Sequence, residues 1–215
     1  MPFHADIQAY TSFPTVVGAR ATLEGPARLR LSLGGGLLPT AYLNAIDNTA
    51  TANGWYDDQT SEVIQAALEH SAEFSAHLGW RPFPKHGFQF ELGYGFAGLG
   101  GGLTAGEVLA IETGYNIPAD TFPASFSYTL TANLHRAEVS AGWEWVFARH
   151  FIVRVDLGGS FTVATKATLK PNFDVPWFLQ SYEDDFETNV TSKLEQTFDQ
   201  SVQTPILAVG AGYRF

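Results

Sequence analysis

The chain alternates between apolar residues and polar or small ones over most of its length. In its last eleven residues, Pro205–Phe215, every second side chain from Leu207 onward is apolar, and the positions between are mostly small and end in Arg214. Alternation with a period of two is typical of a β-strand with one apolar face. Eleven residues rise about 36 Å, enough for a tilted strand to cross a bilayer core of about 30 Å. The C-terminal segment is therefore predicted to be a membrane-spanning strand.

Seven further stretches show this alternation in full or in part. They predict strands over Ala5–Phe13, Val16–Glu24, Ala27–Leu37, Phe74–Trp80, Phe88–Ala97, Phe126–Phe147 and Phe151–Leu169. The first alternates least, because Tyr10 breaks its phase, and it brings the number of strands to eight. Near His135 and Arg136 the apolar phase slips, which predicts a β-bulge in a strand whose first half projects beyond the membrane.

Three long connections separate these strands and alternate with short turns. They cover about residues 38–72, 100–123 and 170–203. Each contains a segment with helical spacing of its apolar residues: Ser61–His70, Thr104–Gly114 and Trp177–Val202. Thr104 and Glu107 match a capping box at the start of the second helix. Because short helices are marginally stable alone in water, we expect the three apolar stripes to pack on one another as a cap.

The connections and the aromatic residues predict an all-β domain over residues 1–215, an eight-stranded antiparallel transmembrane β-barrel with added loop helices. Short turns on one side and long loops on the other are typical of such barrels. Aromatic residues then meet at the level of the short turns as a membrane-interface girdle: Trp80, Phe88, Trp143, Trp145, Phe147, Phe151, Tyr213 and Phe215. The alternative is a soluble lipocalin-type barrel, because alternation alone does not distinguish inside from outside.

The end of the chain, Tyr213-Arg214-Phe215, resembles the closing strand of bacterial outer-membrane β-barrels. In that class the terminal aromatic residue is part of the signal for the barrel-assembly machinery. The whole chain is similar to the small eight-stranded barrels of the OmpA type, from which the loop helices are a departure. The resemblance implies an outer-membrane location, contact with the lipid bilayer and lipopolysaccharide, and a monomer. No signal peptide precedes Ala5-Asp6, so we interpret the start as that of a mature chain.

Composition agrees with a barrel and excludes other classes. Only 16% of the 215 residues are charged, while 45% are hydrophobic and 21 are glycines, which suits a lipid-facing outside and a crowded inside. No run of about 20 apolar residues predicts a transmembrane helix. The chain has no Cys, which excludes disulfides and thiolate metal sites. A net charge of −10 argues against nucleic acid as a partner, and no cofactor is predicted.

Charged residues on the inward phase predict what fills the lumen. They are Arg20, Arg28, Arg30, Glu73, His77, Glu91, Arg136, Glu138, Glu144, Arg154, Asp156, Lys166 and Arg214. Eight strands leave little room, so such groups are expected to pair and close the lumen. An ion or small-solute channel is the alternative. His77 is the candidate base for a lipid-modifying enzyme, a second alternative, but no Ser-His-Glu motif accompanies it and no catalytic residue is predicted.

Gly93-Tyr-Gly95-Phe-Ala-Gly98 matches the pattern of a dinucleotide-binding loop. A first Rossmann strand is apolar throughout, however, and here Gln89 and Glu91 alternate with aromatic residues. We therefore interpret these glycines as residues that face a crowded barrel interior.

Acidic residues gather in the long loops, chiefly Asp57, Asp58, Glu183, Asp184, Asp185 and Glu187. They predict either a solvated helical face or a surface that binds a cationic extracellular partner or cation-bridged lipopolysaccharide. Their spacing lacks the glycine of a calcium loop, so no metal site is predicted. With a closed lumen, the expected role is surface binding or a structural role in the envelope, and not catalysis.

Overall fold

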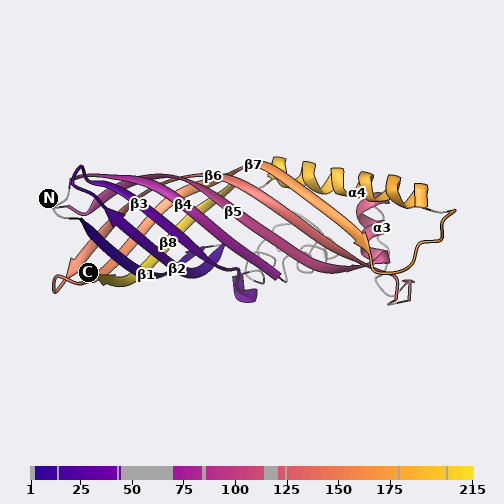
Figure 1. Ribbon diagram of the computed structural model, residues 1–215, viewed down its shortest axis with the longest axis horizontal. Coiled ribbons are helices and arrows are strands. Elements are labelled where there is room, and N and C mark those ends of the chain that lie inside the picture. Colours follow the sequence, from indigo (N-terminus) through magenta and orange to yellow (C-terminus); the bar gives the residue numbers. More distant parts are fainter. Residues whose placement is uncertain are drawn as a thin grey trace.

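Eight antiparallel strands form a closed barrel in the part of the chain that the computed structural model describes (Figure 1). The described residues are 3–13, 15–42, 44, 70–83, 86–113, 121–123, 125–178, 180–201 and 203–215. The strands are β1 (His4–Phe13), β2 (Val16–Glu24), β3 (Leu29–Leu37), β4 (His70–Phe83), β5 (Phe88–Thr104), β6 (Ser127–Phe147), β7 (Phe151–Pro171) and β8 (Gln203–Arg214). Each pairs with the next, and β1 closes the ring on β8. The predicted eight-stranded antiparallel barrel of the outer-membrane type is confirmed.

Both termini lie at one end of the barrel, together with the β2–β3, β4–β5 and β6–β7 turns (Figure 1). The turn between β2 and β3 is closed by a hydrogen bond of 2.8 Å from the Gly25 N–H to the Leu29 carbonyl. Between β6 and β7, Ala148 and Arg149 have φ angles of 48° and 71°, left-handed values that let the chain reverse within a few residues. From β2 onward, short and long connections therefore alternate as the sequence predicts, whereas the short β1–β2 turn lies at the other end of the barrel.

The aromatic residues expected at the membrane interface lie on the outer surface near this end. All eight are at least partly exposed, and Phe88 is covered most, because it packs edge-on against Trp143 with ring centroids 5.4 Å apart. Pairing of β7 with β8 brings the rings of Phe151 and Tyr213 within 6.0 Å. Residues that are distant in sequence thus converge at one level on the outside of the barrel.

Two strands run further than the sequence suggested. β5 continues to Thr104, although a loop was expected from Gly100, because Gly100 pairs with Thr131 of β6. β4 continues to Phe83, so Arg81 lies in a strand and not in a turn. The Arg81 N–H donates to the Arg28 carbonyl over 3.1 Å. In both places, backbone pairing with a neighbouring segment outweighs a local preference for loop.

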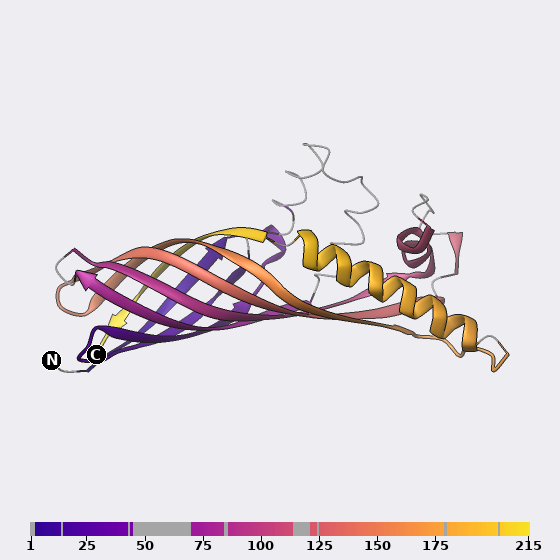
Figure 2. The ribbon, with the colours of Figure 1, turned by 90° about the horizontal axis from the view of Figure 1, so that it is seen from above.

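Strands β5, β6 and β7 project beyond the rest of the barrel on the side away from the termini (Figure 2). The pairing of β4 with β5 stops at Gly100 and that of β8 with β7 stops at Phe161, whereas β6 and β7 stay paired further. We define the extension as the following segments: 97–104, 127–134 and 164–171 of the strands, α3 (Ala105–Thr113) and α4 (Gln180–Ser201). Eight residues per strand correspond to a length of roughly 26 Å.

The two helices α3 and α4 pack on the inner face of the extension (Figure 2). They share one buried core with the strands: Leu103, Ala105, Val108, Tyr128, Leu130, Leu169 and Val190. The expected capping box is present at α3, because the Thr104 N–H donates to Glu107 Oε2 over 2.6 Å and the Glu107 N–H donates to Thr104 Oγ1 over 3.3 Å. Short helices are thus stabilised by packing on a sheet.

The expected helical cap therefore needs a correction. The apolar stripes of α3 and α4 pack on strands β5, β6 and β7 as well as on each other, so the cap is not made of helices alone. The third expected helix, Ser61–His70, lies outside the described residues except for His70, which begins β4. No helix in the described ranges is long and apolar enough to span a membrane.

A β-bulge on β7 turns apolar residues of the extension inward. β6 keeps one phase throughout, with its even-numbered side chains inward. On β7, Val163 is the extra residue, because its neighbours Thr162 and Ala164 pair with consecutive residues of β6. Inward positions on β7 change from even numbers below the bulge, such as Asp156, to odd numbers above it, such as Leu169. The register of the β6–β7 pairing shifts between His135 and Arg136, where the sequence predicts a bulge. The extra residue, however, belongs to β7 and not to β6.

The two faces of the sheet exchange polarity at the level of this bulge. Below it, apolar Leu157 points outward and is 55% exposed, while Asp156 points inward and is 3% exposed. Above it, Lys166 and Thr131 point outward, while Leu130 points inward and is 1% exposed. An apolar outer band suits hydrocarbon, and a polar outer face over an apolar core suits water. The bulge thus marks one boundary of the membrane-spanning part, and the soluble-barrel alternative is wrong.

The packing of α4 can be tested with Val190→Asp, which places a carboxylate in a fully buried core at a cost of several kcal/mol. We expect α4 to undock while the barrel stays folded, so trypsin should cleave after the exposed Lys193 at least about tenfold faster. The matched control is Asn189→Asp at the exposed neighbouring position, which should behave as wild type. Equal cleavage rates in the two variants would show that this core does not hold the helix.

Candidate functional site

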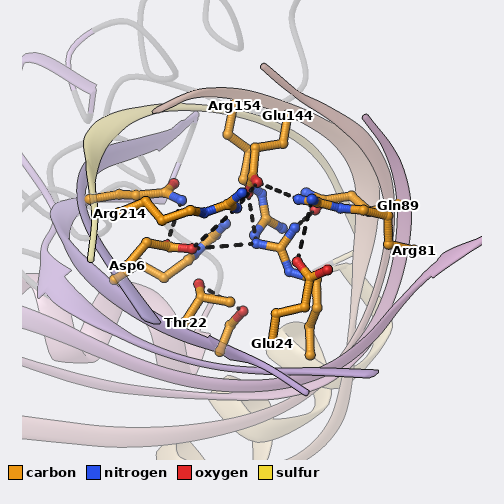
Figure 3. Close-up of polar contacts among 12 residues, drawn as sticks. Asp6, Thr22, Glu24, Arg81, Gln89, Glu144, Arg154 and Arg214 are labelled. Carbon is orange, nitrogen blue, oxygen red and sulfur yellow. Dashed lines mark hydrogen bonds and ion pairs between the residues drawn. The ribbon is translucent and has the colours of Figure 1, made fainter. Parts of the chain in front are cut away.

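The barrel lumen is the main candidate site, and a network of charged side chains fills it (Figure 3). Besides His77, the network has six arginines and seven carboxylates: Arg20, Arg30, Arg81, Arg136, Arg154 and Arg214, with Asp6, Glu24, Glu73, Glu91, Glu138, Glu144 and Asp156. The formal charges of +6 and −7 nearly cancel. Each arginine has at least one carboxylate partner, as buried charges require.

Glu144 is the centre of the layer nearest the termini (Figure 3). Its Oε2 accepts a hydrogen bond of 2.7 Å from Arg30 Nη2, and it forms ion pairs with Arg81 and Arg214. Asp6 Oδ2 lies 4.0 Å from Arg30 and 3.8 Å from Arg214. These residues come from β6, β3, β4, β8 and β1, so two buried carboxylates together connect five strands.

Arg154 holds the middle layer. Its Nη2 lies 2.6 Å from Glu91 Oε2 and its Nε lies 2.7 Å from Asp156 Oδ2. Asp156 also accepts hydrogen bonds from Arg20 over 3.1 Å and from Gln89 Nε2 over 3.0 Å. Because Glu91, Arg154 and Asp156 are all almost fully buried, these charges neutralise one another without help from bulk water.

The upper layer contains His77 and a small cavity. His77 Nε2 lies 2.8 Å from Glu138 Oε2, and Arg136 pairs with Glu73 and, over 3.5 Å, with Glu138. The cavity beside them has a volume of about 20 Å³ and is also lined by Tyr10. That volume holds about one water molecule. It is too small for an acyl chain or a hydrated ion.

The structure places eleven of the thirteen predicted lumen residues inside the barrel, and Arg28 and Lys166 outside it. Arg28 lies in the turn before β3 with a φ of 64°, and its Nη1 donates to the Pro82 carbonyl over 2.9 Å. Because Arg28 lies in the turn and not in β3, the alternation of the strand does not set the direction of its side chain. Lys166 lies above the bulge at Val163, which reverses the phase of β7, so its exposed side chain faces outward.

Asp6, Glu24 and Arg81 complete the network. Glu24 shares the inward phase of Arg20 in β2, whereas the sequence did not single out Asp6 and Arg81. Asp6 begins a polar inward phase in β1 that continues with Gln8, and this phase was the signal that could have found it. Tyr10 interrupts the polar pattern of the inward positions, because it is aromatic yet faces the lumen. There the Arg20 guanidinium lies 4.5 Å from the centre of its ring. Arg81 precedes a proline, so local preference gave no sign of a strand.

The glycines of the dinucleotide-like pattern make room for lumen side chains. A Cβ on Gly93 would lie 2.1 Å from His77 Cδ2, and one on Gly95 would lie 2.3 Å from Glu138 Oε1. The interpretation that these glycines face a crowded interior is confirmed for Gly93 and Gly95, whereas Gly98 lies on the outward phase of β5. Among the described residues, no group of three or more His, Asp or Glu side chains is placed to hold a metal ion.

The acidic face of α4 is a second candidate site. Asp184 and Asp185 are exposed, whereas Glu183 and Glu187 are partly covered. Partial burial raises the pKa of the Glu183 carboxyl, and the nearby charges of Glu187 and Asp184 raise it further. Like charges are therefore crowded at the start of this helix. Asp57 and Asp58, predicted to belong to the same surface, lie outside the described residues.

Exposed aromatic residues lie in and next to the connection from β7 to the acidic start of α4. This connection is the tip of the extension (Figure 2). Trp177 is 84% exposed, Phe178 is 61% exposed and Tyr182 is 73% exposed. The rings of Trp177 and Phe178 meet edge-on with centroids 5.9 Å apart. Neighbouring exposed rings are a feature of binding surfaces, where Trp and Tyr contribute most of the binding energy.

Three solved structures are similar to this chain over nearly all of its length. The N-terminal β-barrel domain of OprF from Pseudomonas aeruginosa is 12% identical, with 99% of this chain and 96% of that chain covered and a TM-score of 0.45. A major outer membrane protein from Thermus thermophilus is 13% identical, with 98% and 99% covered and a TM-score of 0.46. CarO2 from Acinetobacter baumannii is 15% identical, with 100% and 99% covered and a TM-score of 0.40. No protein-family model and no curated protein matches the chain.

The role of Glu144 can be tested with Glu144→Gln, which keeps its shape and removes its charge. Arg30, Arg81 and Arg214 would then share one fewer carboxylate in the lumen. Breaking a buried ion pair costs about 3 kcal/mol or more. On gel electrophoresis of samples heated in detergent, the temperature at which the band of the folded protein is replaced by that of the unfolded protein should therefore fall clearly. Asp184→Asn on the exposed face of α4 is the control and should leave this temperature unchanged. If both variants melt alike, Glu144 does not organise the lumen.

Proposed function

We propose that this chain is a non-conducting outer-membrane protein whose extension binds a cationic partner outside the cell. The exchange of polarity at Val163 supports the orientation, since the apolar band lies between this bulge and the end with the termini. The termini and the β2–β3, β4–β5 and β6–β7 turns then face the periplasm, and the extension faces outward, as is general for such barrels. The aromatic tip beside an acidic helix is the observation that carries the binding role.

The filled lumen supports the non-conducting part of this proposal. Three layers of paired charges occupy it, and the cavity beside His77 has room for about one water molecule. The small volume also argues against a lipid-modifying enzyme. His77 is 7% exposed and pairs with Glu138 inside the barrel, whereas lipid acyl chains contact the outer face. We therefore place His77 in the hydrogen-bond network and not in a catalytic site.

The rigidity of the extension supports a binding role. Val190 and Leu130 belong to one buried core, so α4 has a fixed position on the strands. A pre-ordered surface loses little conformational entropy on binding. At its tip, aromatic faces attract cations and the neighbouring carboxylates add long-range attraction. The chemistry of the surface fits a partner rich in lysine or arginine.

Planar-bilayer recording tests the closed lumen. The purified protein should insert without producing a steady, well-defined conductance, because paired charges fill the lumen at every level. Insertion is checked in parallel by protease protection of the barrel in the same lipid. A reproducible open channel in correctly inserted protein would instead favour the small-solute or ion channel.

Binding by the tip can be tested with a fluorescent peptide of ten lysines and protein in phosphatidylcholine vesicles. We expect the peptide to bind wild type, and Trp177→Ala to weaken binding roughly tenfold, because exposed aromatic residues dominate such interfaces. Asp184→Asn with Asp185→Asn should weaken binding and reduce its dependence on salt.

The controls for this experiment are a peptide of ten glutamates, which should not bind, and Asn189→Ala on the exposed side of α4, which should bind as wild type. Unchanged affinity of Trp177→Ala for the lysine peptide, or equal binding of both peptides, would contradict the proposed function.

A further inference from the structure

The outer face of the extension differs in charge from its helical side. The outward residues of its strands are Lys166, Lys170 and ten uncharged residues of the types Gly, Ala, Ser, Thr and Asn. None of them is acidic, and two are lysines. The acidic residues of α4 lie on the opposite side of the sheet, which α4 covers. The extension thus separates a cationic sheet face from an acidic helix face.

Lys166 is the cation of this face that lies closest to the membrane. Lys166 pairs with Asn133 of the neighbouring strand β6. The next outward-facing pair toward the membrane is Ala164 of β7 with His135 of β6. The side chain of Lys166 is exposed, and no carboxylate forms an ion pair with it in the described part of the chain. A lone lysine at this level has its charge free for a partner outside the protein.

The height of Lys166 above the hydrocarbon can be estimated from β7. The outward apolar residues of this strand run from Phe151 to Val163, which are both about 60% exposed. Twelve steps of about 3.3 Å at a tilt of about 40° span about 30 Å, the thickness of a hydrocarbon core. Lys166 lies three steps further, about 8 Å higher. The polar headgroup region on each side of a bilayer is about 5–8 Å thick. Lys166 therefore lies at the outer limit of this region, from which its long side chain can reach the lipid phosphates.

Aromatic and polar groups directly below Lys166 complete an interfacial site. The Tyr94 hydroxyl hydrogen-bonds to His135 Nδ1, and the Phe96 ring packs edge-on against His135 with centroids 5.5 Å apart. Tyr94 lies on the lipid-facing surface and is 43% exposed. Aromatic residues of this type mark the boundary between hydrocarbon and headgroups. A lipid lying against β5, β6 and β7 would therefore meet rings first and then, at its headgroup, Asn133 and Lys166.

We propose that the outer face at Lys166, with Asn133 and His135, binds a phosphate group of the phosphorylated glycolipid in the outer leaflet. The ligand class follows from charge complementarity, since a cation with no ion-pair partner among the described residues lies within reach of anionic headgroups. The acyl chains of the glycolipid would lie along the apolar band below. This inference rests on the outer-membrane placement of the proposed function, but it does not depend on the aromatic tip.

Native mass spectrometry of the whole protein in mild detergent tests this site, with bisphosphorylated lipid A as the probe. Wild type should retain this probe better than lipid A of the same acylation without phosphates. Lys166→Ala should weaken retention about fivefold, as expected for one lysine at an anionic lipid surface, and Lys166→Arg should restore it. Lys193→Ala, an exposed lysine on α4, is the matched control and should retain the probe as wild type does.

Equal retention by Lys166→Ala and wild type, or no preference for the phosphorylated probe, would overturn the proposal. Equal, Lys166-dependent retention of phosphatidylglycerol would assign the site to phospholipid and would overturn the glycolipid assignment. Binding of the ten-lysine peptide by Lys166→Ala separates the two proposals. If that binding is unchanged, a loss of lipid A retention concerns this site alone, and a loss of peptide binding in Trp177→Ala concerns the proposed function alone.

Discussion

Closure of the sheet between β1 and β8 is the constraint on which the rest of this structure depends. In hydrocarbon, each unpaired backbone N–H or C=O costs several kcal/mol, so a membrane-spanning sheet must have no free edge. Pairing of Ile7 with Tyr213 and of Phe13 with Leu207 removes the last edge. A ring of eight strands then encloses a narrow interior, and its contents are decided by space as much as by chemistry.

The charges of the lumen follow from that closure. With apolar side chains on the lipid face, the period of two places the polar residues inside, where water cannot solvate them. They are tolerated because carboxylates such as Glu144 and Asp156 each contact more than one arginine. Glycines at positions such as Gly93 leave room for these large side chains. The network therefore closes the barrel and also joins strands that do not pair with one another.

The extension meets a different solvent and shows the reverse arrangement. Above the membrane its outer face contacts water, so the apolar residues lie on the inner face and need cover. Helix α4 provides that cover, and Glu195 Oε1 accepts a hydrogen bond of 2.9 Å from the Ala167 N–H. Ala167 lies above the last residue of β7 that pairs with β8, so this contact satisfies a group on an open edge. One sheet thus serves as a membrane wall below and as the support of a small soluble core above.

The sequence by itself determined the eight strands, the aromatic girdle and most of the lumen charges, because alternation with a period of two is a local property of each segment. It did not determine which strand carries the bulge, since the slip near His135 is compatible with an extra residue on either partner. The strand pairing shows that Val163 of β7 is the extra residue. Because this residue reverses the phase of β7, Lys166 faces outward. Arg81 lies in the lumen and Arg28 lies outside it for a similar reason. Strand ends are fixed by hydrogen bonds to residues distant in sequence, and a local sequence pattern contains no information on these bonds.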